Sequence, residues 1–354
     1  MLLRINRPLL CGMILGRDGG LPAIKVEDIV DVARAAGRVI MDVYSTDPET
    51  WDSRSKSDNT PVTKADVMSD DLIRKRLLSA YPDIPIISEE SEPLSFEERQ
   101  DYEYCWVVDP LDGTKEFMKR TGEFAVMIGL SLRGKAVLGV VHAPALETPK
   151  TYYAVAGKGA YVLRGGDERG GKGLGDSERI SARSFRTLDP GLRLAISSSR
   201  PPKTFIASCD SPVTCSIGSA ALKAIAVADG TVDMYPCLYP TSEWDTCAPQ
   251  IIVEEAGGSV LRYDGSGEGG MSEVAALLRA TEARNMEAVS AAAPAATHAA
   301  DAAAAAAAAA GGSDEGKGSK LPASSNPGDD LGLSYNKEDL ASPRCLFLGH
   351  YSAS

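Results

Sequence analysis

The segment 106–117, WVVDPLDGTKEF, constrains the chain more than any other because it ends an apolar run with two acids. Its first three residues predict a short buried strand, which we expect Pro110 and Gly113 to end abruptly. Asp109 and Asp112 then lie three residues apart on a tight turn. Burying two like charges there is costly unless a cation neutralises them.

The residue types in this turn indicate one kind of cation. Carboxylates and backbone carbonyls without a nearby His or Cys are hard oxygen ligands, which suit Mg²⁺ rather than Zn²⁺. Asp-x-x-Asp-Gly by itself is equally compatible with a solvated turn, because Asp and Gly are ordinary turn formers. The longer string, with its strand, Pro, Thr and aromatic residue in fixed register, favours the metal site.

Length and composition are those of a globular protein. A chain of 354 residues has room for one large or two medium domains, and 44% hydrophobic and 24% charged residues are ordinary values. A net charge of −12 argues against nucleic acid or an anionic membrane as the main partner. It is still compatible with a phosphorylated small molecule, provided that metal ions make the site locally positive. No apolar run approaches the roughly 20 residues of a membrane span.

The cysteines and the N-terminus bear on the compartment. Seven cysteines, an odd number with no Cys-x-x-Cys, suit reduced thiols in an intracellular protein, so we expect a cytoplasmic location. Residues 1–24 combine three arginines with a short apolar stretch. We expect a leader there that is disordered or that targets the chain, in which case the location would be a plastid or mitochondrion.

Periodicity predicts several regular elements. Apolar residues at helical spacing predict helices over 26–44 and from Asp66 to about Ala80. The apolar runs 124–132, 136–141 and 151–156 predict an antiparallel meander, with a final strand over 345–348. His142 stands at a strand end with no carboxylate or Cys in register, and we expect it to be structural.

The hexapeptide 109–114, Asp-Pro-Leu-Asp-Gly-Thr, resembles the DP(I/L)DGT signature of the Mg²⁺-dependent, lithium-sensitive phosphatases that include inositol monophosphatase. Its extension, Lys-Glu-Phe at 115–117, resembles the 3'(2'),5'-bisphosphate nucleotidase branch of that superfamily. Other segments resemble the family's motifs in the family's order: 56–66, 88–90, 216–223, 239–248 and 333–343. The resemblance covers about residues 25–265 and 330–348.

The resemblance implies an α+β fold, an αβαβα layered sandwich of the inositol monophosphatase and fructose-1,6-bisphosphatase type, with the site between two halves. We expect an N-terminal α+β domain with the metal site over residues 25–175. A C-terminal α/β domain follows over 176–265 and 329–350. Residues 266–328, which include an unbroken run of alanines over 302–310, are expected to be an Ala/Gly-rich low-complexity insertion.

The resemblance also assigns residues to roles. The implied metal ligands are Glu89, Asp109, the carbonyl of Leu111, Asp112 and Asp245. The implied catalytic pair is Thr114, which would accept a proton from the attacking water, and Asp66, which would accept one from Thr114. A Thr hydroxyl suits such a relay because it donates and accepts at once. Without the resemblance, Asp66 and Asp245 are ordinary acids near the start of a helix, and Glu89 is an acid in a loop.

Substrate contacts are implied at Gly113, Thr114, Gly218, Ser219 and Lys223. The segment 216–223 enters a helix, whose free N–H groups bind anions readily. Lys223 stands where bisphosphate nucleotidases carry a basic residue, which favours a second phosphate on the substrate. Two features depart from that branch: the spacing of Gly-Ser-Ala-Ala-Leu-Lys matches inositol phosphatases, and Cys237 stands where nucleotidases usually have a substrate-binding Arg.

The function implied is hydrolysis of the 3'-phosphate of adenosine 3',5'-bisphosphate to AMP and phosphate, with two or three Mg²⁺ ions and inhibition by lithium. 3'-Phosphoadenosine 5'-phosphosulfate is a further candidate substrate, as expected in sulfur assimilation. The alternatives are an inositol monophosphatase-like enzyme and an inactive phosphonucleotide-binding or redox-responsive protein. The sequence leaves the oligomeric state open.

Overall fold

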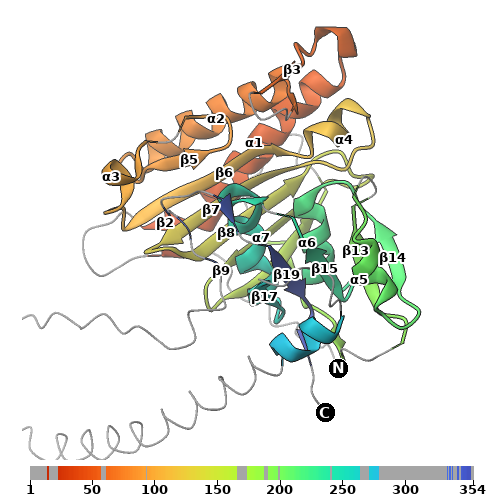
Figure 1. Cartoon of the computed structure of the whole chain (residues 1–354). Coiled ribbons are helices and arrows are strands. Elements are labelled where there is room, and N and C mark those ends of the chain that lie inside the picture. Colours follow the sequence, from red (N-terminus) through yellow and green to blue (C-terminus); the bar gives the residue numbers. More distant parts are fainter. Residues whose placement is uncertain are drawn as a thin grey trace, which may run out of the picture.

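The computed structural model describes most of the chain between residues 23 and 263, together with shorter stretches on either side (Figure 1). The described residues are 14–15, 23–56, 61–92, 94–165, 174–186, 190–197, 200–239, 241–263, 271–278, 333, 335, 337, 341–342 and 344–351. They form five layers, in which helices and two sheets alternate. The predicted αβαβα sandwich is therefore confirmed.

The first layer is a pair of helices, α1 (Val26–Tyr44) and α2 (Lys64–Ala80). Figure 1 shows them lying across one face of the first sheet. Both have the extents predicted from periodicity, to within two residues. Helix α1 buries its apolar stripe in a cluster that includes Trp106 and Val108 of the sheet below.

The second layer is a sheet of seven strands in the order β11-β10-β9-β8-β7-β6-β5. All neighbours are antiparallel except β5 and β6. The strands are β5 (Ile86–Ser88), β6 (Tyr104–Asp112), β7 (Ala125–Leu132), β8 (Lys135–Ala143), β9 (Lys150–Val155), β10 (Gly159–Arg164) and β11 (Glu178–Ile180). The predicted meander is present as β7, β8 and β9. Because β11 pairs with β10, the first half extends past the boundary expected at residue 175.

The third layer consists of α6 (Ala220–Ala228) and α7 (Glu243–Glu255), which pack against the other face of the first sheet. The contact is close: a Cβ added at Gly139 of β8 would lie 2.4 Å from the carbonyl oxygen of Ala248. Alternation along β6 serves both layers, because Cys105 and Val107 face this layer while Trp106 and Val108 face α1 and α2.

The fourth layer is a sheet of five strands in the order β14-β13-β15-β19-β17. Strand β13 is parallel to β14 and to β15, whereas β19 runs antiparallel to both of its neighbours. The strands are β13 (Arg193–Ile196), β14 (Val213–Ser216), β15 (Met234–Cys237), β17 (Ser259–Arg262) and β19 (Cys345–Leu348). The predicted final strand over 345–348 is thus present, and it lies inside the sheet.

The fifth layer includes a helix from the predicted Ala/Gly-rich insertion, residues 266–328. Residues 271–278 form this helix beside α5 (Lys203–Ala207). Met271, Val274 and Leu278 are buried with the outer face of the second sheet, at the i, i+3 and i+7 spacing of a helix that packs on one side. The remainder of 266–328 lies outside the described residues.

Short elements complete the connections. Helices α3 (Phe96–Arg99) and α4 (Thr114–Met118) and a 3₁₀ turn at Pro48–Thr50 link the larger ones. Two-residue strands pair as β1 (Ile14–Leu15) with β2 (Ile24–Lys25), β3 (Arg54–Ser55) with β4 (Pro61–Val62), β12 (Ser184–Phe185) with β20 (His350–Tyr351), and β16 (Thr241–Ser242) with β18 (Ala341–Ser342). Most of the predicted leader 1–24 lies outside the described residues.

Two further observations concern the chain as a whole. Within the described ranges, no helix has both the length and the apolar character needed to cross a membrane. Six cysteines are described as free thiols, and the seventh, Cys11, lies outside the described residues.

His142 is buried between the first sheet and α1, as its predicted structural role requires. Its Nδ1 lies 2.9 Å from Thr151 Oγ1, and a Cβ added at Gly37 of α1 would lie 2.4 Å from the ring. Burial lowers the pKa of His142 from 6.5 to about 3, with nearby Arg34 as a smaller cause. The ring is therefore neutral in the folded protein.

This buried neutral histidine predicts a loss of stability in acid. The unfolded chain takes up a proton below pH 6.5 while the folded chain does not, so the stabilisation is complete above pH 6.5 and is lost as the pH falls towards 3. Between pH 7.5 and 5 this histidine alone should cost about 2 kcal/mol. Urea unfolding of His142→Gln should show that much less pH dependence than the wild type between pH 7.5 and 5. If the free energy of unfolding of His142→Gln varied with pH as much as that of the wild type, a neutral buried His142 would be contradicted.

Candidate active site

The first two acids of the site lie at the irregular end of β6. The prediction that Pro110 ends the strand is wrong: β6 continues to Asp112. Its register against β7 shifts between Asp109 and Asp112, and this bulge lets the strand pass through the proline. Such a bulge accommodates a proline, which has no N–H for the ladder. Ser69 of α2 holds the bulge by donating to the carbonyl of Pro110 at 2.8 Å, and the Leu111 N–H donates to Asp109 Oδ1 at 3.0 Å.

The third acid comes from the other half of the molecule. Asp245 lies in the first turn of α7, and its Oδ2 accepts a hydrogen bond of 2.7 Å from the Ser242 N–H. Oxygen atoms of Asp109, Asp112 and Asp245 all lie within 4.8 Å of one another. Three of the predicted ligands, from segments up to 136 residues apart, are therefore in one place, between the first sheet and α7.

The electrostatics of this cluster are those of a cation site. Burial raises the pKa of Asp109 well above its usual value, and the neighbouring Glu89, Asp112 and Asp245 raise it further. Burial likewise raises the pKa of Asp245, with Asp112 as the next cause. Carboxylate oxygens are the ligands of hard divalent cations, and a bound cation would offset this repulsion. The residues present therefore fit a hard metal ion.

Asp112 is held in place from across the site by the start of α6. Its Oδ2 accepts hydrogen bonds from the Ser219 hydroxyl and from the Ala221 N–H, the latter at 2.8 Å. The adjacent Gly218 N–H donates to Glu123 Oε2 at 3.1 Å. A Cβ at Gly218 would lie 2.2 Å from Glu116 Cγ and 2.9 Å from Glu123 Oε2, so a larger residue would displace these side chains. The predicted substrate segment thus docks on two acids of the first half.

The predicted catalytic pair is in contact. Thr114 Oγ1 donates to Asp66 Oδ1 at 2.9 Å, while Asp66 Oδ2 accepts from the N–H and the hydroxyl of Thr63 at 2.8 and 2.6 Å. Burial raises the pKa of Asp66, and the bonds from Thr63 and Thr114 counteract that rise. Gly113 precedes Thr114 with φ of 90°, a left-handed conformation that favours glycine and lets α4 begin directly after β6.

Glu89 lies outside the three-acid cluster. It follows β5, and its Oε1 accepts from Lys56 Nζ at 2.8 Å; the same ammonium binds Glu90 Oε1 at 2.6 Å. The pKa of Glu90 is raised to about 7, mainly by burial, although the bond from Lys56 opposes the rise. Glu89 is nevertheless close enough to raise the pKa of Asp109. Its role as a metal ligand stays a prediction, as does that of the Leu111 carbonyl.

Lys223 is buried in α6 and points back at its own N-terminal loop. Its ammonium donates to the carbonyls of Gly218 and Ser219 at 2.8 Å each and to that of Ile217 at 3.3 Å. These bonds use all three donors of an ammonium group. In this structure Lys223 therefore fixes the loop that binds Asp112 and Glu123, and a direct contact with substrate stays a prediction.

Sequence reasoning missed several residues that hold the site. Ser69, Glu123 and Lys56 make long-range side-chain bonds for which the sequence gives no general signal. Lys56 has a partial signal, because it opens the motif that ends in Asp66. Asp70 belongs to the same group: its carboxylate accepts from the hydroxyls of Ser88 and Ser91 and so holds the segment that carries Glu89.

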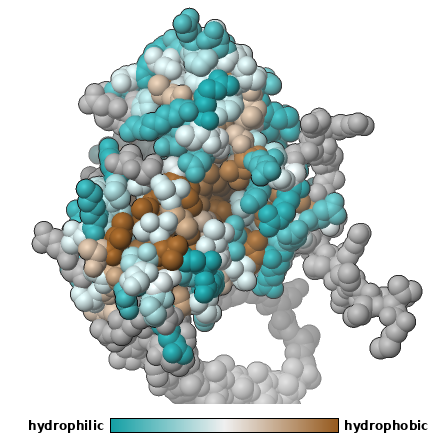
Figure 2. Space-filling view, turned by 90° about the vertical axis from the view of Figure 1, so that its right-hand side faces the viewer, coloured by the Kyte–Doolittle hydropathy of each residue, from teal (hydrophilic) through white to brown (hydrophobic). Residues whose placement is uncertain are grey.

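The surface around the site is uneven. Figure 2 shows apolar side chains gathered across the middle of the face that Figure 1 has on its right, below a more hydrophilic upper part.

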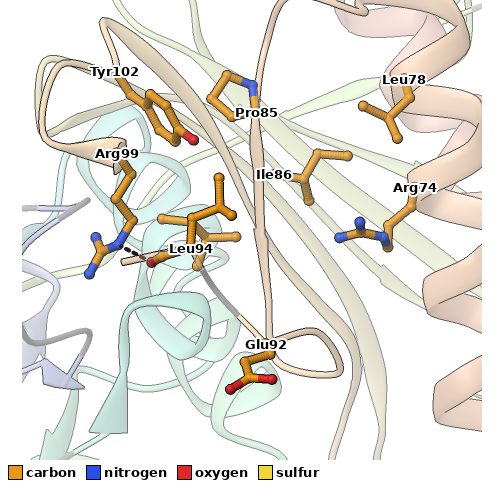
Figure 3. Close-up of a pocket in the computed structure, with 9 residues that line it drawn as sticks. Arg74, Leu78, Pro85, Ile86, Glu92, Leu94, Arg99 and Tyr102 are labelled. Atoms are coloured by element: carbon orange, nitrogen blue, oxygen red, sulfur yellow. Dashed lines mark hydrogen bonds between the residues drawn. The ribbon is translucent and has the colours of Figure 1, made fainter. Parts of the chain in front are cut away.

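A separate pocket of about 270 Å³ lies at the β5 edge (Figure 3), where Arg99 Nε donates to the Leu94 carbonyl at 3.2 Å. Its lining includes Arg74 and Tyr102 but none of the predicted site residues.

Comparison with known proteins identifies the family. A family model described as the inositol monophosphatase family matches residues 25–309, which is most of the chain. The chain belongs to the inositol monophosphatase family. Members of this family are metal-dependent, in agreement with the buried carboxylate cluster.

The alignments with individual relatives span most of each relative's length. The chain is 41% identical over 244 residues to the 3'(2'),5'-bisphosphate nucleotidase CysQ of Shigella flexneri. This alignment covers 68% of this chain and 91% of that protein. For CysQ of Aggregatibacter actinomycetemcomitans the values are 35% over 239 residues, 67% and 83%.

Solved structures agree with this assignment. CysQ from Bacteroides thetaiotaomicron superposes with a TM-score of 0.61 at 27% identity, over 92% of this chain and 98% of that one. The inositol monophosphatase of Thermotoga maritima superposes with a TM-score of 0.55 at 27% identity, over 69% of this chain and 86% of that one.

The carboxylate cluster predicts opposite effects of one substitution on metal-free and metal-loaded protein. Asp109→Asn removes one of the mutually repelling charges, so thermal unfolding in EDTA should occur several degrees higher than in the wild type. The rise in melting temperature on adding Mg²⁺ should be large in the wild type and lost in the variant. Asp210→Asn, on the exposed surface, should change neither. A destabilised Asp109→Asn in EDTA would show that repulsion does not dominate this site.

Proposed function

We propose that this family member is a Mg²⁺-dependent phosphomonoesterase that removes the 3'-phosphate of adenosine 3',5'-bisphosphate, giving AMP and phosphate. 3'-Phosphoadenosine 5'-phosphosulfate is a second candidate substrate. The observation that carries the proposal is the convergence of Asp109, Asp112 and Asp245 beside the Thr114–Asp66 pair. The curated relatives named as 3'(2'),5'-bisphosphate nucleotidases, at 35–41% identity, support this substrate.

The proposed ligands for two or three Mg²⁺ ions are the three clustered acids, the Leu111 carbonyl and Glu89. Bound there, the metal would acidify a water and neutralise the charge of the phosphate. The protein's part is to hold the oxygens still. Ser219 and Ala221 fix Asp112, Ser242 fixes Asp245, and the bulge of β6 fixes Asp109.

Thr114 is proposed to position and deprotonate the attacking water. Because its hydroxyl proton is directed at Asp66, the lone pairs of Oγ1 are left to accept from a water on the other side. Asp66 can take that proton because two bonds from Thr63 hold its carboxylate in place. A buried base with a raised pKa is better suited to receive a proton at neutral pH than an exposed carboxylate.

The runner-up is an inositol monophosphatase-like activity. This alternative is favoured because residue 237 is a cysteine. Its thiol is buried against β19 and donates a weak hydrogen bond to the Tyr239 carbonyl at 3.8 Å. A basic residue that could bind a 5'-phosphate from this position is therefore absent. An inactive nucleotide-binding protein is less well supported, because Thr114 and Asp66 are in contact.

The substrate assignment predicts a preference that one assay can measure. Phosphate release with Mg²⁺ should be at least about tenfold more efficient in kcat/KM for adenosine 3',5'-bisphosphate than for inositol 1-phosphate, a discrimination of about 1.4 kcal/mol. Lithium should inhibit both reactions. Asp112→Asn should abolish release from either ester. A preference for the inositol ester would establish the runner-up instead, and metal binding without turnover of either ester would indicate a binding protein.

The proposed proton transfer through Thr114 predicts that two substitutions of this residue differ in kcat. Thr114→Val keeps the shape of the side chain but removes the hydroxyl, and kcat should fall by about 10²-fold or more with a small change in KM. Thr114→Ser restores a hydroxyl and should retain most of the activity. Steady-state kinetics on adenosine 3',5'-bisphosphate checks both. Equal losses in the Val and Ser variants would mean that Thr114 acts by packing and not by proton transfer.

A further inference from the structure

The second sheet has a feature that the metal site does not use. Adjacent parallel strands β13 and β15 end at the same edge, but the chain leaves them towards opposite faces. After β13 it enters α5, which packs on the outer face through Phe205; after β15 it enters α7, which packs on the inner face. Where neighbouring strands diverge in this way, their carboxyl ends leave a crevice that commonly binds ligands in open α/β sheets.

Two side chains on the diverging connections meet at that edge. Arg200 follows β13 and Tyr239 follows β15, and the guanidinium carbon of Arg200 lies 5.8 Å from the centre of the Tyr239 ring. This is the geometry of a cation–π contact. The contact spans the gap between the two connections.

Tyr239 is unusual among the aromatic residues of the described ranges. This residue is 48% exposed. Among the described residues, it is the one aromatic residue in the set of exposed large hydrophobic residues. Arg200 is also exposed, and its guanidinium forms no ion pair with a carboxylate of the described residues. A half-exposed aromatic ring and a cation with no carboxylate partner among the described residues thus lie together in a protein of net charge −12.

The position of the pair is fixed relative to the metal site. The carbonyl of Tyr239 accepts from the Cys237 thiol, and the chain then enters β16, which pairs with β18. Strand β16 ends at Ser242, whose N–H binds Asp245. On the other side, β14 ends at the same edge and leads into Gly218 and Ser219, which bind Glu123 and Asp112.

We propose that the Tyr239 ring, with Arg200 over one of its faces, is the platform on which the nucleobase of the substrate stacks. The inference rests on the proposed function and names the part of the protein that distinguishes a nucleotide from a base-free phosphate ester. Bases stack on aromatic rings and on guanidinium planes through their π-faces, and this contact tolerates different bases. Tyr239 and Arg200 are thus specificity residues that do not take part in the chemistry.

The test compares two substrates that differ only in the base: adenosine 3',5'-bisphosphate and ribose 3,5-bisphosphate. Tyr239→Ala should raise KM for the nucleotide about tenfold and leave kcat within about twofold, as expected for the loss of one stacked base. It should change neither constant for the ribose ester. Arg200→Ala should act in the same direction, and Tyr239→Phe should resemble the wild type because the ring is kept.

A matched control is Val213→Ala, which shortens another exposed apolar side chain on the same sheet and should affect neither substrate. Equal effects of Tyr239→Ala on the two substrates would overturn the proposal, because the residue would then act through the loop that leads to Asp245. No effect on either would overturn it as well.

Binding of adenosine 3',5'-bisphosphate, measured by calorimetry with Ca²⁺ in place of Mg²⁺, separates this proposal from the proposed function. A wild type that binds the nucleotide about tenfold more tightly than Tyr239→Ala, but does not hydrolyse it when Mg²⁺ is supplied, would support the platform and overturn the phosphatase activity. Hydrolysis of the nucleotide with equal affinity in both proteins would support the activity and overturn the platform.

Discussion

Repulsion among buried carboxylates is the constraint on which the rest of the structure depends. Asp109, Asp112 and Asp245 lie within 4.8 Å of one another, and burial and mutual repulsion raise the pKa of Asp109 and Asp245. Such a cluster persists only where the fold holds each member in place. Here the β6 bulge, the start of α6 and the start of α7 each hold one carboxylate. A bound cation would offset this repulsion, in agreement with the metal dependence of the inositol monophosphatase family.

The two halves meet through polar contacts at the site and through packing elsewhere. Asp112 and Glu123 of the first half accept from the loop before α6, while Gly139 of β8 lies directly against Ala248 of α7. The placement of Asp245 relative to Asp109 and Asp112 therefore depends on the packing of α6 and α7 against the first sheet. The same edge of the second sheet carries the proposed base platform, because the connections that leave β13 and β15 bring Arg200 and Tyr239 together there.

Much of this arrangement could be predicted from the sequence, and the exceptions have physical reasons. Helix α1 and the meander follow from local periodicity, and the acids of β6 from a motif within six residues. The bulge at Pro110 was missed because a proline ordinarily ends a strand, whereas here a register shift accommodates it. The bonds of Lys56 to Glu89 and of Ser219 to Asp112 join residues 33 and 107 apart, which no local pattern encodes. The helix at 271–278 was hidden by the alanine-rich composition that follows it.

The position of β19 in the second sheet determines when the site can assemble. This strand lies between β15 and β17, yet it comes from residues 345–348, after the long alanine-rich stretch. Domains generally fold as the ribosome releases them, from the N-terminus onwards. The first sheet, with Asp109 and Asp112, can form early during synthesis, but the second sheet, which lies behind the helix of Asp245, lacks an inner strand until residues 345–348 emerge. A nascent chain truncated anywhere before β19 should therefore present two of the three carboxylates without the third correctly placed.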